Sequence, residues 1–121
     1  MTCFIYIATP TKWGQNKNGH KNGFKIGYTA DPTVRNYGLR HRDGYTIRQT
    51  YSFDAPCERV GTAVENLAQV EFILHWADKV KPMGDDYFKC SKVTADKALK
   101  QFIAIVDNAY NKVMGQLPSP L

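Results

Sequence analysis

A glutamate on the apolar face of a helix is the most informative feature of the sequence. Glu71 follows Leu67 by four residues and Val64 by seven, so in a helix it projects from the face that carries the apolar stripe. Glu58 and Glu65 fall off that stripe and are expected to be solvated. A carboxylate on the stripe has to be paired, hydrogen-bonded or bound to a cation, because burying it bare is too costly. Glu71 is therefore either a functional carboxylate or a structural one, at the edge of the stripe or in a salt bridge with an arginine at the rim of the core.

Three other side chains could converge on such a carboxylate. We expect Tyr6 and Lys25 on adjacent strands, and Arg35 in the first turn of the helix that follows. An arginine fork binds two phosphate oxygens, and a carboxylate can hold a divalent cation that neutralises developing charge. A hydroxyl or an amine can orient or deprotonate the attacking water. These residue types indicate phosphoryl chemistry, although a strand tyrosine is more often core and a helix arginine is more often solvated.

The elements that must position these side chains form an α+β pattern. Strands are predicted where β-branched and aromatic residues cluster or alternate, at 2–8, 23–29, 45–53 and 87–90. Helices are predicted where apolar residues recur every three or four positions, at 32–42, about 55–80, and from about 94 onward. Asp31 followed by Pro32 is a helix-start signal. We expect a small central antiparallel sheet, of about three strands plus a short edge strand, flanked by helices.

Length and charge limit the possibilities further. A chain of 121 residues has room for one compact core, so we expect a single domain over 1–114 and a frayed C-terminal tail over 115–121. The formal charge of +5 favours an anionic partner, of which nucleic acid is the commonest.

The cysteines and the N-terminus indicate the compartment. The chain has an odd number of cysteines, Cys3, Cys57 and Cys90, and no two of them form a CxxC pair. This argues against a disulfide framework or a structural zinc site. The apolar N-terminus lacks the basic region of a signal peptide and is too short to span a membrane. A cytoplasmic protein with no membrane partner is therefore predicted.

The spacing of the candidate residues resembles that of the GIY-YIG nuclease superfamily. Phe-Ile-Tyr at 4–6 stands where the family has Gly-Ile-Tyr, and Lys-Ile-Gly at 25–27 stands where it has Tyr-Ile-Gly. Arg35 falls eight residues after the glycine, as the helix arginine of the family does. Glu-Phe-Ile-Leu-His at 71–75 matches the Glu-x-x-Leu-His run of a phage and bacterial branch of the superfamily. Members of this branch commonly have Lys-Ile-Gly in place of Tyr-Ile-Gly. Asp-Tyr-Phe at 86–88 occupies the place of that branch's Glu-Trp-Phe strand.

This resemblance covers about residues 2–90 and implies a metal-dependent endonuclease that cuts DNA, with RNA left open. It implies one Mg²⁺ or Mn²⁺ held directly by Glu71. Tyr6 would be the general base or the water-orienting group, and Arg35 would stabilise the charged transition state. Gly27 would let the backbone approach the phosphate. Cutting both strands would need a homodimer or sequential nicking, and a phage-encoded enzyme would act in the host cytoplasm.

The chain also departs from the family pattern. Lys25 replaces the second tyrosine and could bind phosphate directly, or act as a base if desolvation lowers its pKa. Phe4 replaces the first glycine. His75, one helical turn after Glu71, could support the site or be structural, and His41 is a second candidate proton acceptor.

A basic loop of eighteen residues separates Tyr6 from Lys25 and could contact nucleic acid or have no partner. The candidate contact residues are Lys12, Trp13, Lys17, His20 and Lys21 in the loop and Arg40 and Arg42 in the following helix. Two alternatives to an enzyme stay open. One is a nucleic-acid-binding module on the same fold that no longer cuts, and the other is a protein–protein adaptor or inhibitor.

Overall fold

The computed structural model describes residues 1–13, 22–76, 81–82 and 86–116. Along the chain its elements are β1 (Thr2–Pro10), β2 (Gly23–Thr29), α1 (Pro32–Arg42), β3 (Tyr45–Asp54), α2 (Glu58–His75), β4 (Lys81–Pro82), β5 (Tyr87–Lys89) and α3 (Lys92–Gly115). The predicted α+β class, a small antiparallel sheet flanked by helices, is confirmed.

The strands of the described residues form one sheet in the order β3-β1-β2-β5-β4, and each neighbouring pair is antiparallel. β5 and β4 are only three and two residues long, so β1, β2 and β3 make up most of the sheet. β1 is central, and its Tyr6 lies opposite Gly27 of β2 and Thr50 of β3. Hydrogen bonding on both sides fixes which face each side chain of β1 points to.

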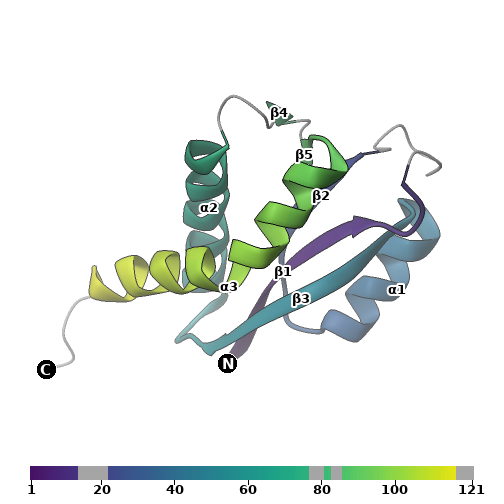
Figure 1. Cartoon of the computed structure of the whole chain (residues 1–121). Coiled ribbons are helices and arrows are strands. Elements are labelled where there is room, and N and C mark those ends of the chain that lie inside the picture. Colours follow the sequence, from purple (N-terminus) through teal and green to yellow (C-terminus); the bar gives the residue numbers. More distant parts are fainter. Residues whose placement is uncertain (14–21, 77–80, 83–85, 117–121) are drawn as a thin grey trace, which may run out of the picture.

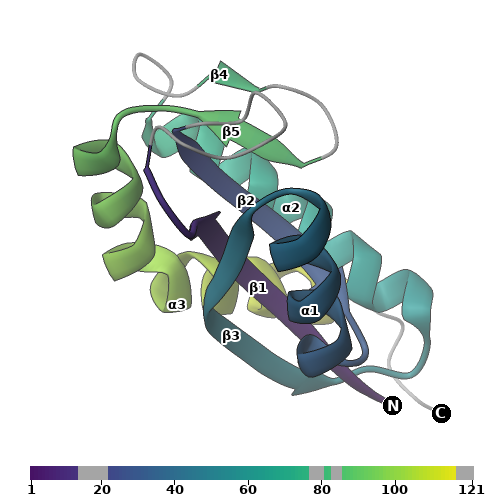
Figure 2. The same ribbon diagram turned by 90° about the vertical axis from the view of Figure 1, so that its right-hand side faces the viewer.

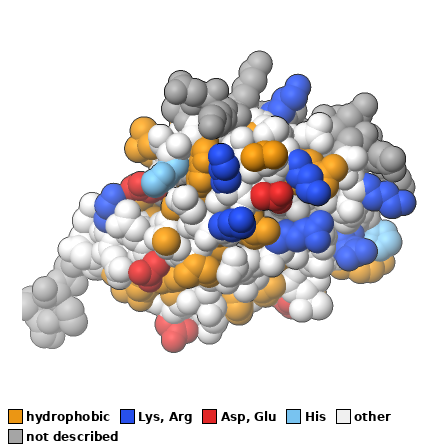
Figure 3. Space-filling view, in the orientation of Figure 1, with side chains coloured by type: hydrophobic (Ala, Val, Ile, Leu, Met, Phe, Trp, Pro, Cys, Tyr) orange, Lys and Arg blue, Asp and Glu red, His pale blue; other side chains and the backbone are white. Residues whose placement is uncertain are grey.

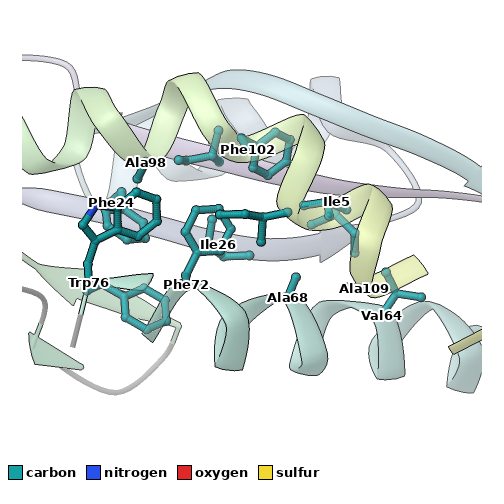
Figure 4. Close-up of a cluster of buried hydrophobic side chains, with 14 of the residues drawn as sticks. Ile5, Phe24, Ile26, Val64, Ala68, Phe72, Trp76, Ala98, Phe102 and Ala109 are labelled. Carbon is teal, nitrogen blue, oxygen red and sulfur yellow. The ribbon is translucent and has the colours of Figure 1, made fainter. Parts of the chain in front are cut away.

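Helices cover both faces of the sheet. α1 lies on one face and α2 and α3 lie on the other (Figures 1 and 2). The main core fills the space between the sheet and the α2–α3 pair, where Ile5 and Ile26 meet Phe72 and Phe102 (Figure 4). Burying a side chain of this size contributes about 1.5–3 kcal/mol. This core holds α2 beside β2.

A second, smaller cluster lies under α1. Its buried members are Tyr6, Ala8, Leu39, Tyr45 and Tyr87. Because successive strand side chains point to opposite faces, the neighbours of Tyr6 and Ala8 along β1 enter the main core instead. The face of the sheet under α1 is therefore the face that carries Tyr6.

The predicted start of α1 is confirmed. Asp31 is the N-cap and its carboxylate accepts a hydrogen bond of 3.2 Å from the backbone N–H of Val34. Pro32 occupies the first turn, where a missing N–H costs nothing. The helix ends before Gly44, which has a φ of 68°.

The other two helices differ from the prediction at their ends. α2 covers Glu58–His75 rather than 55–80, and residues 77–80 lie outside the described part of the chain. α3 begins at Lys92, because Ser91 caps it by accepting from the N–H of Thr94 at 3.2 Å. The predicted frayed tail began at 115, but Gly115 is the last residue of α3, and 117–121 are not described. Within the described residues, no helix has the length and apolarity needed to cross a membrane.

Candidate active site

Tyr6 and Gly27 form the base of the site. Tyr6 is 1% exposed, and a Cβ placed on Gly27 would lie 2.3 Å from the Tyr6 hydroxyl oxygen. A glycine is therefore required opposite Tyr6 for the phenol to occupy this position. Arg35, projecting from the first turn of α1, donates a side-chain hydrogen bond to the same hydroxyl. Burial raises the pKa of Tyr6 to about 12, and the guanidinium of Arg35 opposes that rise.

Lys25 lies beside this pair on the same face of β2. It is 8% exposed, its Nζ lies 3.9 Å from an oxygen of Asp86, and it lies 4.6 Å from the centroid of the Tyr87 ring. Burial lowers the pKa of Lys25, while the negative charge of Asp86 opposes this effect. A lysine buried this far is easier to deprotonate than a solvated one.

Asp86 precedes β5 and has an unusual backbone conformation. Its φ is 68°, a left-handed value that aspartate tolerates better than most residues. Its carbonyl accepts a hydrogen bond of 3.2 Å from the N–H of Ile26. This backbone turn brings the Asp86 carboxylate to Lys25.

α2 brings a further carboxylate, that of Glu65, to the edge of β2 near Lys25. Pairing between β2 and β5 ends at Lys25, so the next residues of β2 have no strand partner on that side among the described residues. Side chains of α2 take over the hydrogen bonding: Gln69 donates to the carbonyl of Ile26 at 2.9 Å, and the N–H of Tyr28 donates to Glu65. The two α2 residues are four apart and lie on one side of the helix.

Glu65 is therefore only partly exposed, and the expectation that it is fully solvated is wrong. It is half-buried, and burial raises the pKa of its carboxyl to about 7. The charge of Asp86 adds to the rise, while Lys25 and Arg35 oppose it. Glu65 and Asp86 also act on the pKa of Tyr6. These five groups belong to one electrostatic cluster.

Glu71 is not part of this cluster. Its Oε1 lies 2.7 Å from Nζ of Lys112 on α3, so the salt-bridged alternative describes its surroundings, with lysine in place of arginine. Six residues at about 100° per residue turn Glu71 about 120° away from Glu65 around α2. The structure does not bring Glu71 to Tyr6 or Arg35, and its predicted role as the metal ligand stays a prediction.

The two candidate supporting histidines occupy different places. His75 ends α2, is exposed, and has its ring centroid 5.5 Å from that of Trp76. His41 is exposed on α1, with its ring centroid 4.2 Å from that of Tyr37. His41 shares the lining of a groove with Arg35, whereas His75 lies at the end of the helix that carries Glu65.

The predicted nucleic-acid contacts fall into three groups. Arg40 and Arg42 are exposed in the last turn of α1. Lys12 is exposed, whereas Trp13 is partly buried against the main core. The other loop candidates, Lys17, His20 and Lys21, lie outside the described residues. In the face shown by Figure 3, Lys and Arg side chains extend from the centre of the view, over α3, toward the side where α1 lies, and acidic side chains stand among them at the centre as well as toward the C-terminal end of α3.

The sequence could have indicated Glu65 and Gln69. They are four residues apart and flank the apolar stripe of α2 on the same side, which is the pattern of a polar pair beside a buried face. Within the described residues, no group of three or more His, Cys, Asp or Glu side chains is gathered in a way that could hold a metal ion. The available oxygen ligands are the carboxylates of Glu65 and Asp86.

This α+β fold places a buried tyrosine and lysine, an exposed arginine and two partly buried carboxylates at the edge of a sheet, an arrangement suited to chemistry on anionic substrates. Residues 3–103 match the T5orf172 domain, and the chain belongs to that family. The family is related to nuclease-like phage proteins. No curated protein and no solved structure matches the chain.

Proposed function

We propose that this chain is a metal-dependent endonuclease of the GIY-YIG type that cuts DNA, with Glu65 as its metal-binding carboxylate. The observation that carries the proposal is the meeting of Tyr6, Lys25, Arg35 and Glu65 at the open edge of β2. Membership of the T5orf172 family supports a DNA-related activity.

The ligands present fit the divalent cation that the resemblance implies. Glu65 and Asp86 offer carboxylate oxygens, the donors that Mg²⁺ and Mn²⁺ prefer. Burial is the main cause of the raised pKa of Glu65 and the charge of Asp86 adds to it, so a bound cation would favour the ionised carboxylate there. When bound, the cation supplies positive charge to the phosphate oxygens as charge develops on them.

Three side chains of the site have different roles in the proposed cleavage. The guanidinium of Arg35 binds phosphate oxygens and stabilises the charge that forms on them. Because the pKa of Tyr6 is raised to about 12, its hydroxyl stays protonated at neutral pH and orients the attacking water. When its amine is uncharged, Lys25 accepts the proton of that water, and burial, which lowers the pKa of Lys25, favours that uncharged form.

The role of Lys25 can be separated from simple phosphate binding. Arginine keeps the positive charge and binds phosphate but does not release its proton near neutral pH. We expect Lys25→Arg to lower the rate of cleavage about a hundred-fold while leaving DNA affinity nearly unchanged. A Lys25→Arg variant that cuts at the wild-type rate would instead make Lys25 a phosphate ligand.

A plasmid-nicking assay with Mg²⁺ or Mn²⁺ tests the site as a whole. We expect Glu65→Gln and Arg35→Ala to lose at least about a hundred-fold in rate. Glu71→Gln is the matched control on the same helix and is expected to nick like the wild type. The reverse pattern, with Glu65→Gln active and Glu71→Gln inactive, would assign the metal to Glu71 as the family spacing predicts.

A binding measurement provides a readout that does not depend on activity. Mg²⁺ should raise the melting temperature of the wild type and of Glu71→Gln, but not that of Glu65→Gln, because a ligand stabilises only the state that binds it. A wild-type protein that binds DNA but nicks nothing in either metal would support the alternative of a binding module.

A further inference from the structure

An open groove of about 660 Å³ runs beside the cluster, between the end of β2 and the outer face of α1. Its lining includes Thr29, Arg35, Gly38 and His41. Arg35 belongs to both the groove and the cluster, since it also donates to the Tyr6 hydroxyl. The groove is therefore continuous with the place proposed for the scissile phosphate.

Gly38 forms part of the lining of this groove from the middle of α1. A glycine inside a helix is about 1 kcal/mol less favourable than alanine. The fold offers no packing reason for it, because a Cβ at Gly38 would have nothing within 4 Å. Gly27, by contrast, is required by the Tyr6 ring that lies against it. The surface at Gly38 is therefore open, and a large side chain placed there would project into the groove.

The basic side chains that line the groove favour an anionic ligand. Arg35, His41 and Arg42 line it, and α1 contains no acidic residue. Asp31 is the carboxylate of the lining, and its Oδ1 already accepts the N–H of Val34 at the start of the helix. Phosphate groups placed along this groove would meet two arginines in succession.

An aromatic pair stands beside the arginines. Tyr37 is 68% exposed, and its ring centroid lies 4.2 Å from that of His41, which lines the groove. An exposed aromatic ring next to bound phosphates is a surface on which an unpaired base can stack. A base that is paired inside a duplex does not offer its face in this way.

We propose that the α1 groove binds single-stranded DNA adjoining the bond that is cut, with phosphates at Arg35 and Arg42 and an unpaired base on the Tyr37–His41 pair. This inference rests on the proposed function for the place of the scissile phosphate. It makes a strand end, a flap or a locally opened duplex the favoured substrate.

Fluorescence anisotropy of a labelled oligonucleotide, single-stranded or annealed to its complement, tests the groove. EDTA is present so that no cleavage occurs. We expect Tyr37→Ala and Gly38→Met each to weaken binding of the single strand about ten-fold. Gly38→Ala is the matched control, because its Cβ fits in open space, and it should bind within about two-fold of the wild type.

Two arginines of α1 provide a second matched pair. Arg42 lines the groove, whereas Arg40 is exposed on the same helix turn outside it. Arg42→Gln should weaken binding and lower the slope of affinity against salt by about 0.7, the value for one phosphate contact to a single strand. Arg40→Gln should leave that slope unchanged.

The inference is overturned if Gly38→Met and Tyr37→Ala bind the single strand like the wild type, or if the duplex binds more tightly than the single strand. Failure of the proposed function gives a different result. In that case the wild type nicks nothing with Mg²⁺ or Mn²⁺, while the groove variants still weaken binding of the single strand.

Discussion

Replacing Glu65 with glutamine should remove a pH dependence from the stability of the fold. In the unfolded chain this carboxyl ionises near its ordinary pKa of 4.5, whereas in the folded chain its pKa is about 7. Between these values the folded state keeps a proton that the unfolded state has released, so the free energy of unfolding falls as the pH rises. The pKa difference corresponds to about 3 kcal/mol above pH 7. Because the side chain is partly exposed, solvent screening reduces this to about 1–2 kcal/mol.

Urea denaturation in EDTA, at pH values from about 5 to about 8, measures this effect. The wild type should lose about 1–2 kcal/mol of stability more than Glu65→Gln across the range. At the upper end of the range, Glu65→Gln should therefore be the more stable protein. Glu71→Gln, on the same helix but paired with Lys112, should keep the wild-type slope. Equal slopes for the wild type and Glu65→Gln would refute the placement of Glu65 in a buried, negatively charged setting.

Three further substitutions test how the site is held. Gly27→Ala should abolish nicking and destabilise the fold by about 1–3 kcal/mol, because its Cβ would lie 2.3 Å from the Tyr6 hydroxyl; wild-type nicking and stability would contradict that contact. Gln69→Ala should cost about 1 kcal/mol in denaturation, since it removes the hydrogen bond to the Ile26 carbonyl; Gln69→Glu should not restore it, because a carboxylate cannot donate. Lys112→Ala should change stability by less than about 1 kcal/mol and leave nicking unchanged, and a loss of nicking would show that the α2–α3 salt bridge serves the site.

Local signals in the sequence were enough to predict the order of the elements except for β4, the two-residue strand Lys81–Pro82, which was not predicted. Asp31 and Pro32 mark the start of α1 because capping involves only neighbouring residues. Lys25 and Gly27 are two residues apart in the strand predicted at 23–29 and therefore share a face, and the register of β1 with β2 places Tyr6 opposite Gly27. Turn residues and side-chain alternation determine such features within a few positions of the chain.

The carboxylate of the site could not be chosen on the same grounds. Glu65 and Glu71 lie on one helix, and the apolar stripe alone favours Glu71. The two carboxylates have different surroundings because α2 lies between the edge of β2 and α3. Lys112, forty-one positions along the chain from Glu71, pairs with it, whereas the N–H of Tyr28 reaches Glu65. Contacts this distant in sequence have no signature in a helical pattern.

β1, which carries Tyr6, and α1, which carries Arg35, differ in local stability. Tyr6 lies in β1, which is hydrogen-bonded to a strand on each side, whereas Leu39 is the buried residue of α1. Hydrogen exchange should therefore reach the amides of α1 through local opening, at a lower free energy than those of β1. Each opening withdraws Arg35 from the Tyr6 hydroxyl while the sheet stays intact. Warming should accordingly disable the site before it melts the domain, and a bound strand along α1 should delay that loss.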